Sequence, residues 1–259
     1  MSRFLGLLFC TLILFSASLR AEDCPWFQWR SDGSFTAGGL PFRLVHSSTK
    51  WETSEQNSGS IIPDEKFPAA AKQNFHLRGL FRLRNGKRFR MEETGTYFAG
   101  KMNWSVKVSS SEGIPGSALY LRTTLPVREF LNQEIRMDGK QYGFGETFQK
   151  DRNHFQFNNF VKTIVLPLKE GRLTIRGNFR CRLQDNRQWK HDSWELRILL
   201  DPAWGTIRNS ELKLEFSLEP WNSVPISLKT AANMGFRDEK AGDRRGGWTD
   251  QGPENDLRM

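Results

Sequence analysis

Residues 74–92 read NFHLRGLFRLRNGKRFRME. Apolar residues and a glycine occupy every second position from Phe75 to Leu83, and all but one of the residues between them are polar or basic. This two-residue period is typical of a strand that buries one face. Asn85-Gly86 follows, and this dipeptide favours the tight turn of a hairpin. The segment therefore predicts two antiparallel strands joined at Asn85-Gly86.

Similar signals recur further along the chain. Asp138-Gly139 predicts a second hairpin, between Glu134–Met137 and Lys140–Phe144. Residues 47–74 are rich in Ser, Asn, Gly and Pro, and we expect them to form a long loop. About ten strands with only one short helix candidate favour an all-β fold, an antiparallel β-sandwich. The further predicted strands are Trp104–Val108, Ala118–Leu125, Phe155–Phe160, Lys162–Leu166, Arg172–Leu183, Trp194–Leu200 and Glu211–Leu218, and the helix candidate is Val127–Leu131.

The N-terminus has the layout of a secretory signal peptide. Arg3 precedes a nearly unbroken apolar run from Phe4 to Phe15, and a polar stretch with small residues leads to Ala21. This pattern predicts a signal peptide over residues 1–21, cut after Ala21, and a secreted or periplasmic protein. The apolar run is too short to remain as a transmembrane anchor.

The composition predicts two further segments. Residues 22–222 are expected to form one β-sandwich domain, since all-β domains reach this size without division. Residues 223–259 read as a linker followed by the start of a second module that the chain does not complete. We therefore expect this chain to be a fragment of a longer protein or a truncated reading frame.

The chain carries a net charge of +9, and about +7 once the two arginines of the signal peptide are removed. Export disfavours nucleic acid as the partner, and neither a recognition helix nor zinc-ligand spacing is visible. An acidic or sulfated polysaccharide, or the anionic cell envelope, would respond to the same field. A basic surface that is merely solvated is the simpler alternative.

Two cysteines, Cys24 and Cys181, remain after signal cleavage. In an oxidising compartment two thiols tend to pair, so Cys24–Cys181 is a disulfide candidate. Two unrelated buried thiols are the alternative.

No local sequence motif in this chain indicates a catalytic site. The carboxylates that could serve a glycoside hydrolase, which needs a facing pair, are dispersed, so no catalytic residue is assigned. Convergence of two of them in space would make the chain an enzyme, and this alternative stays open. The carboxylates considered are Glu92, Glu93, Glu146, Glu195 and Asp201.

Tryptophans in polar loops indicate sugar binding, because flat aromatic rings stack on the apolar faces of sugars. Trp51 and Trp189 lie in such loops, and Trp248 lies in the glycine-rich C-terminal segment. These three are the predicted stacking platforms. The competing interpretation is that loop tryptophans only cap the ends of the sandwich. Trp104 and Trp194 lie within strands and are expected in the core.

The C-terminal segment, residues 233–258, is rich in glycine and aspartate and has no regular period. Its aspartates could hold a structural calcium ion, which takes six to eight oxygen ligands. Arg244-Arg245 places positive charge beside any such cation, and aspartates satisfied by local turns are the alternative. The weak calcium candidates are Asp238, Asp243, Asp250 and Asp256.

Residues 246–258, GGWTDQGPENDLR, resemble a segment that opens a galactose-binding-like β-sandwich module in secreted, multidomain, polysaccharide-acting proteins of environmental bacteria. Leu196–Gly205 and Asp32–Phe35 resemble the N-terminal β-sandwich regions that precede catalytic modules in large secreted carbohydrate-active enzymes. The resemblance implies a non-catalytic, glycan-binding or accessory module in polysaccharide degradation, with a catalytic domain downstream. A glycoside hydrolase-type enzyme and a structural, envelope-associated protein are the alternatives.

Overall fold

The computed structural model describes residues 24–64, 74–143, 145–148, 155–201 and 205–221. Fifteen strands and two helical turns, α1 (Val127–Phe130) and the 3₁₀ turn η1 (Asn186–Trp189), make up this part of the chain. No helix among these residues is long and apolar enough to cross a membrane. The strands are β1 (Phe27–Trp29), β2 (Phe35–Ala37), β3 (Leu40–Ser47), β4 (Thr53–Glu55), β5 (Ile61–Pro63), β6 (Asn74–Arg82), β7 (Arg88–Phe98), β8 (Lys101–Gly116), β9 (Ala118–Pro126), β10 (Glu134–Met137), β11 (Lys140–Gly143), β12 (Phe155–Pro167), β13 (Gly171–Asp185), β14 (Ser193–Asp201) and β15 (Gly205–Pro220).

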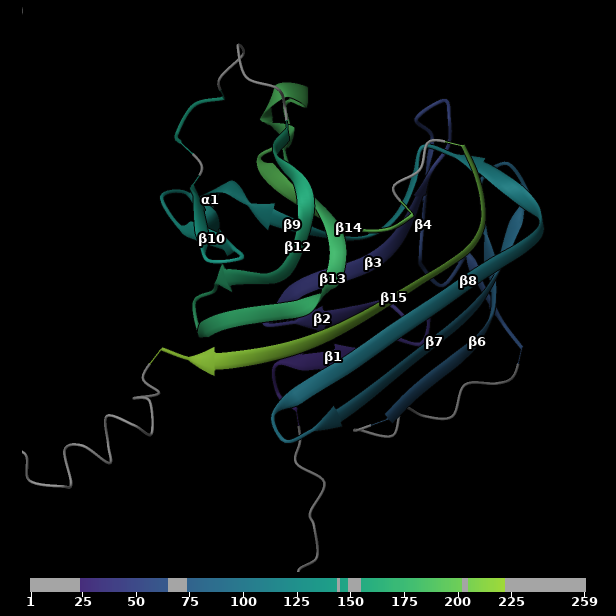
Figure 1. The fold of residues 1–259 in the computed structure, drawn as a ribbon, viewed down its shortest axis with the longest axis horizontal. Coiled ribbons are helices and arrows are strands. Elements are labelled where there is room, and N and C mark those ends of the chain that lie inside the picture. Colours follow the sequence, from purple (N-terminus) through teal and green to yellow (C-terminus); the bar gives the residue numbers. More distant parts are fainter. Residues whose placement is uncertain (1–23, 65–73, 144, 149–154, 202–204, 222–259) are drawn as a thin grey trace, which may run out of the picture. The chain divides into compact units, whose positions relative to one another are not determined.

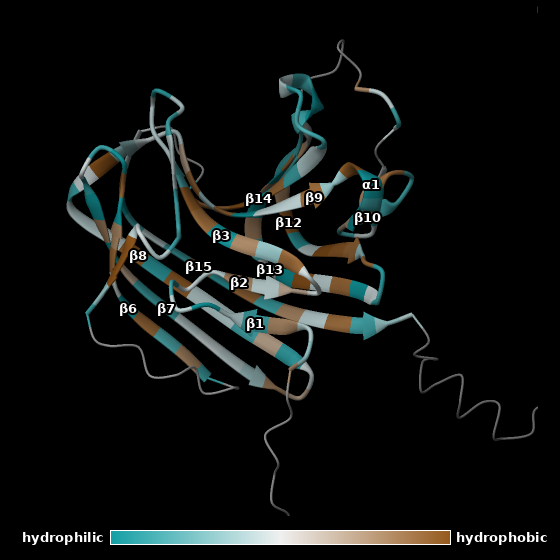
Figure 2. Ribbon diagram, turned by 180° about the vertical axis from the view of Figure 1, so that it is seen from behind, coloured by the Kyte–Doolittle hydropathy of each residue, from teal (hydrophilic) through white to brown (hydrophobic). Residues whose placement is uncertain are grey.

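The predicted all-β, antiparallel fold is confirmed. The hairpin at Asn85-Gly86 joins β6 to β7 in the register Arg82↔Arg88, and Gly86 has the positive φ of 81° that such turns need. Along β6 buried residues alternate with more exposed ones, and this alternation of burial continues along β7 and through β8 as far as Val108; Figure 2 shows these strands coloured by hydropathy. The hairpin at Asp138-Gly139 also forms, between β10 and β11.

The two halves of β13 pair with different strands along the same edge, and this divides the sheet into two layers. Gly171–Gly177 pairs with β15, which continues through β8, β7, β6 and β5. Arg180–Asp185 pairs with β14, which continues through β9, β3, β2 and β1. In Figure 1, β6, β7, β8 and β15 run side by side in front, with β1–β3 behind them.

Aromatic side chains fill the space between the layers. Phe35 of β2 packs against Trp104 of β8 and Phe216 of β15, with ring centroids 5.6 Å and 5.4 Å apart. Phe42 of β3 also contacts Phe216. Trp104 and Trp194, expected in the core, are both buried. These contacts join strands of both layers in the larger hydrophobic cluster, and a second, smaller cluster consists of Val45, Ala118, Tyr120 and Leu199.

Two segments differ from the prediction. Residues 47–74 are not a single loop, because β4 pairs with β3 and β5 pairs with β6. Phe155–Pro167 is one strand rather than two, with an irregularity between Val161 and Thr163. Asp138 of the facing hairpin holds this irregularity, since its carboxylate accepts hydrogen bonds from the backbone N–H groups of Lys162 and Thr163. A sequence pattern confined to neighbouring residues cannot predict these hydrogen bonds, because Asp138 lies 24 and 25 residues from its two donors.

The predicted Cys24–Cys181 disulfide is absent, and both cysteines are free thiols. Cys181 lies fully buried on β13, where burial strongly raises the pKa of its thiol. Cys24 is half-buried before β1, and burial raises its pKa despite a hydrogen bond with Tyr97. Each thiol therefore has its own packing environment, as the alternative interpretation expected.

Several predictions lie outside the described residues. They are the signal peptide over residues 1–21, the segment 223–259, the stacking candidate Trp248 and the calcium candidates Asp238, Asp243, Asp250 and Asp256.

Candidate functional site

The candidate site is a cavity of about 940 Å³ on the face of β9, β13 and β14 that points away from the core. Two exposed tryptophans and three arginines lie among its lining residues. We call it the arginine cleft, and it is lined by Trp51, Thr53, Ser117, Tyr120, Arg122, Thr124, Asn158, Arg182, Gln184, Asn186, Trp189, His191, Ser193, Glu195 and Arg197.

Strand register builds the floor of the cleft. Arg122 of β9 lies opposite Arg43 of β3 on one side and opposite Arg197 of β14 on the other. Arg197 in turn lies opposite Arg182 of β13, and Arg182 opposite Asn158 of β12. Four arginines and an asparagine therefore form one row across five adjacent strands, which we call the arginine row. Neighbouring strands lie roughly 4.8 Å apart, and like charges directly opposite one another are destabilising.

Two glutamates offset part of this repulsion. Glu55 of β4 pairs with Arg122 at 2.5 Å and with Arg43 at 3.7 Å. Glu195 of β14 pairs with Arg197 and lies 3.9 Å from the second guanidinium nitrogen of Arg122. Burial acts to lower the pKa of Arg122, but the charges of Glu195 and Glu55 outweigh it and raise that pKa. The Arg43–Arg122–Arg197 end of the row is therefore held by ion pairs.

Arg182, at the other end, has a more positive environment. Its guanidinium donates a hydrogen bond of 3.3 Å to the amide oxygen of Asn158, which also accepts one of 3.0 Å from Arg180. Burial lowers the pKa of Arg182, and the neighbouring cations Arg180 and Arg197 lower it further. Arg182 therefore has two other cations, Arg180 and Arg197, as near neighbours.

Trp51 is presented at one rim by a braced hairpin loop. It lies between β3 and β4, and its side chain is 68% exposed. Its φ of 66° is unusual for a bulky residue. Ser48 holds the loop, since its backbone N–H donates to Glu52 and its hydroxyl accepts from the N–H groups of Lys50 and Glu52. A strained backbone that is held by its surroundings is a common feature of binding loops.

Trp189 is presented by the 3₁₀ turn η1 and is 49% exposed. Asp185 caps the turn, accepting from the backbone N–H of Arg187 and pairing with its guanidinium at 2.6 Å. Burial acts to raise the pKa of Asp185, but the hydrogen bonds from Arg187 outweigh it and keep that pKa low. Arg187 also donates to the backbone oxygens of Gly145 and Glu146, which ties the turn to a second loop.

The candidate catalytic carboxylates do not gather here. Glu92 and Glu93 are adjacent on β7 and so point to opposite faces: Glu92 pairs with Arg78 outside, while Glu93 is fully buried. Asp201 accepts a hydrogen bond from Ser210, and it is absent from the lining of the cleft, as is Glu146. Of the described lining residues, Glu195 is the only carboxylate.

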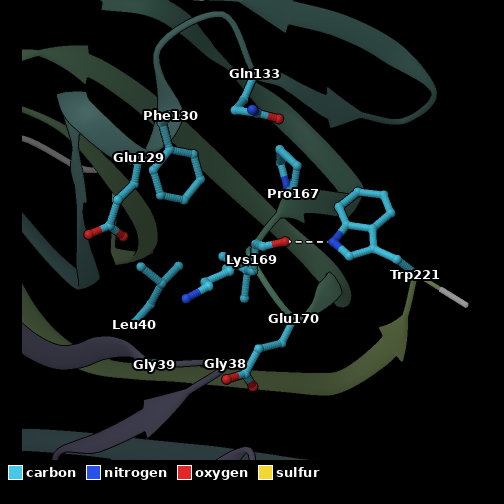
Figure 3. Close-up of a pocket in the computed structure, with 11 residues that line it drawn as sticks. Gly38, Gly39, Leu40, Glu129, Phe130, Gln133, Pro167, Lys169, Glu170 and Trp221 are labelled. Carbon is cyan, nitrogen blue, oxygen red and sulfur yellow. Dashed lines mark hydrogen bonds between the residues drawn. The ribbon is translucent and has the colours of Figure 1, made fainter.

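A second cavity, of about 710 Å³, lies beside Trp221 at the end of β15 (Figure 3). Its polar lining includes Glu129, Glu170 and Lys169, so carboxylates outnumber cations. The Trp221 indole N–H donates to the backbone oxygen of Leu168, and the Arg172 guanidinium lies over the ring. This cavity has one exposed tryptophan, whereas the arginine cleft has two.

The structure brings together the two sequence-predicted platforms, Trp51 and Trp189. Sequence reasoning missed the arginine row because the residues that form it lie far apart in the chain. The available signal was local: Arg180 and Arg182 alternate with buried residues on one strand and Glu195 and Arg197 on another. Only the pairing register places them side by side.

No protein-family model matches the chain, and no curated protein matches it either. Three carbohydrate-processing proteins of solved structure resemble it: an α-mannosidase from Enterococcus faecalis V583 (TM-score 0.49, 9% identity, 80% of this chain and 30% of that one), a glycosyl hydrolase family 38 protein from Enterococcus faecalis (0.47, 8%, 80% and 30%) and a chondroitinase AC lyase (0.35, 9%, 76% and 36%). This chain spans about a third of their length. Similarities at this level carry no conclusion about its ligand or reaction.

Proposed function

We propose that this chain is a secreted, non-catalytic glycan-binding module of a polysaccharide-processing protein, and that the arginine cleft is its binding site. The observation that carries the proposal is the meeting of Trp51 and Trp189 in one cavity, although they belong to different loops far apart in the sequence. Two exposed indoles at one cleft supply the flat apolar surfaces on which sugar rings stack.

The rest of the lining suits a polyhydroxylated ligand. Asn158, Gln184 and Asn186 present amide groups, and Ser193 and Thr124 present hydroxyls. Apart from the aromatic rings of Trp51, Tyr120 and Trp189, the lining is polar or charged, so it can hydrogen-bond the hydroxyl groups of a sugar. The hydrogen bonds that brace both tryptophan loops reduce the entropy lost when a ligand binds.

A binding role is favoured over hydrolysis by the charges in the cleft. Glycosidases use two carboxyl groups separated by roughly 5 to 9.5 Å across the scissile bond. Among the described residues that line the cleft, Glu195 alone supplies a carboxylate, and it is engaged with Arg197 and lies close to Arg122. No second carboxylate among the described lining residues faces Glu195 across the cleft, so the facing pair that glycosidases use is not present in this lining.

Trp51→Ala and Trp189→Ala are each expected to weaken glycan binding about tenfold, since stacking of one ring contributes on the order of 1 to 1.5 kcal/mol. An array of neutral and acidic oligosaccharides identifies the ligand, and titration calorimetry then measures the affinities. Trp221→Ala is the matched control, because Trp221 is 48% exposed but lies outside the cleft. Absence of binding across the array, or equal loss in all three variants, would refute the proposal.

A further inference from the structure

We infer that the cleft recognises an anionic group on its glycan, a carboxylate or a sulfate, and that Arg182 with Arg197 is the element that selects it. This inference rests on the proposed glycan-binding function. It places the acidic or sulfated ligand that the net charge suggested at a specific site, and it assigns residues that sequence reasoning did not single out.

Cations outnumber carboxylates in the lining of the cleft. Among the described residues, Arg122, Arg182 and Arg197 line it together with one carboxylate, that of Glu195. The arginine row as a whole has four cations, and Glu55 and Glu195 are the carboxylates that pair with it. Placing like charges opposite one another on adjacent strands lowers stability. An anionic ligand would relieve this repulsion when it binds.

The cations and carboxylates are unevenly distributed along the arginine row. Glu55 and Glu195 form ion pairs at one end of the row, with Arg43, Arg122 and Arg197. At the other end, Arg180 and Arg182 both donate hydrogen bonds to the Asn158 amide oxygen. Burial lowers the pKa of Arg182, and the charges of Arg180 and Arg197 lie close enough to lower it further, so three cations are neighbours here. An anion is therefore favoured beside Arg182.

The guanidinium groups of the cleft suit the oxygen atoms of a carboxylate or a sulfate. Guanidinium groups bind planar carboxylates and sulfate oxygens through paired N–H donors. Arg182 and Arg197 lie opposite each other on adjacent strands and line the same cavity as Trp189. A sugar ring that stacks on the Trp189 indole can therefore direct its charged substituent towards Arg182 and Arg197.

Single-stranded nucleic acid also combines charge with stacking surfaces. The row is less suited to it, because Glu55 and Glu195 alternate with the arginines and would repel a continuous phosphate backbone. An isolated anionic group avoids those carboxylates by binding at the Arg182 end.

The test compares four ligands by titration calorimetry: oligogalacturonate, the same oligosaccharide after reduction of its carboxyl groups to alcohols, a sulfated galactan oligosaccharide and an oligothymidylate. We expect at least one acidic glycan to bind the wild type about tenfold or more tightly than the carboxyl-reduced form. Preference for oligogalacturonate identifies the group as a carboxylate, and preference for the sulfated glycan identifies it as a sulfate. Added salt should weaken the acidic ligand selectively.

Arg182→Gln should lower the affinity for the acidic glycan by a much larger factor than the affinity for the neutral glycan, so that most of the preference is lost, and Arg182→Lys should restore part of it. Arg88→Gln, on an exposed position of β7 outside the cleft, removes the same charge and should change nothing. Circular dichroism confirms that each variant is folded. If Arg182→Gln does not fold, Arg182→Lys and the salt titration of the wild type decide the question.

Three results would overturn the inference. Neutral glycan binding as tightly as both acidic ones removes the anionic selectivity but leaves the proposed glycan-binding function intact. Equal losses of acidic and neutral affinity in Arg182→Gln would give Arg182 a structural role only. Oligothymidylate binding more tightly than every glycan would refute both the inference and the proposed function.

Discussion

Glu93→Gln is expected to make the protein less stable than the wild type at pH 5 and more stable at pH 9, so that the two stability curves cross. Glu93 is fully buried on β7. Its carboxyl group accepts hydrogen bonds from the Trp104 indole N–H at 2.6 Å and from the Gln56 amide at 2.9 Å. Burial nevertheless raises the pKa of Glu93 from 4.5 to about 8, and the nearby charge of Asp32 adds to this.

The sign of the effect follows from proton linkage. The folded state keeps a proton on Glu93 up to about pH 8, whereas the unfolded chain loses it near pH 4.5. Between these values the folded state binds more protons, so the free energy of unfolding falls by about 1.4 kcal/mol for each pH unit. The stabilisation is complete below pH 4.5 and is lost as the pH rises through 8. The total is roughly 5 kcal/mol, a large share of the stability of an ordinary domain.

Glutamine at this position cannot ionise, but its amide has only one oxygen that can accept hydrogen bonds, whereas the carboxyl group of glutamate has two. If its oxygen accepts from Trp104, its amide nitrogen faces the amide nitrogen of Gln56, which already donates to the backbone oxygen of Asp32. A buried donor left without its acceptor costs about 1–3 kcal/mol. The curves should therefore cross between about pH 5.5 and 7, and the variant should be about 2–4 kcal/mol more stable at pH 9.

Urea unfolding of both proteins across pH 5 to 9 measures this difference. His46, whose pKa burial lowers, gives a slope of the opposite sign below its ordinary value of 6.5, but it is present in both proteins and cancels. Glu92→Gln is the matched control, because it removes an exposed neighbouring carboxylate and should leave the wild-type slope above pH 5. Parallel curves for Glu93→Gln and the wild type would mean that Glu93 is ionised in the folded state.

The features that could be predicted from the sequence are those fixed by neighbouring residues. The alternation from Phe75 to Leu83 and the turns at Asn85-Gly86 and Asp138-Gly139 involve contacts within a few residues, and all of them form. Trp51 and Trp189 could be predicted as exposed for the same reason, since each lies in a local run of polar residues.

The features that escaped prediction depend on which strands pair and in which register. The Arg122–Arg197–Arg182 row exists because β9, β14 and β13 pair in that register. A shift of one residue would turn every one of these side chains towards the core. The meeting of Trp51 with Trp189 depends on the same pairings, so each platform was predictable and their shared cleft was not.

Gly95→Ala is expected to destabilise the protein by about 2–3 kcal/mol, although alanine normally improves a strand position held by glycine. A Cβ atom on Gly95 of β7 would lie 2.0 Å from the Cζ2 atom of the Trp29 indole. Trp29 cannot move aside freely, because its ring stacks on Phe75 with centroids 4.2 Å apart and planes 9° apart. The same indole contacts Phe27 and Phe35, so displacing it disturbs the aromatic core.

Urea unfolding measures the cost, and Gly145→Ala is the control, since a Cβ atom there meets no atom of the described residues within 4 Å. A second variant separates packing from backbone effects. In a Trp29→Leu background the indole is gone, and Gly95→Ala should then cost close to nothing, which gives a coupling of roughly 2 kcal/mol between the two positions. Strictly additive effects would place the cost in the backbone of β7 instead. The coupling tests directly whether β1 packs against β7 through the space that the missing side chain of Gly95 leaves for the Trp29 indole.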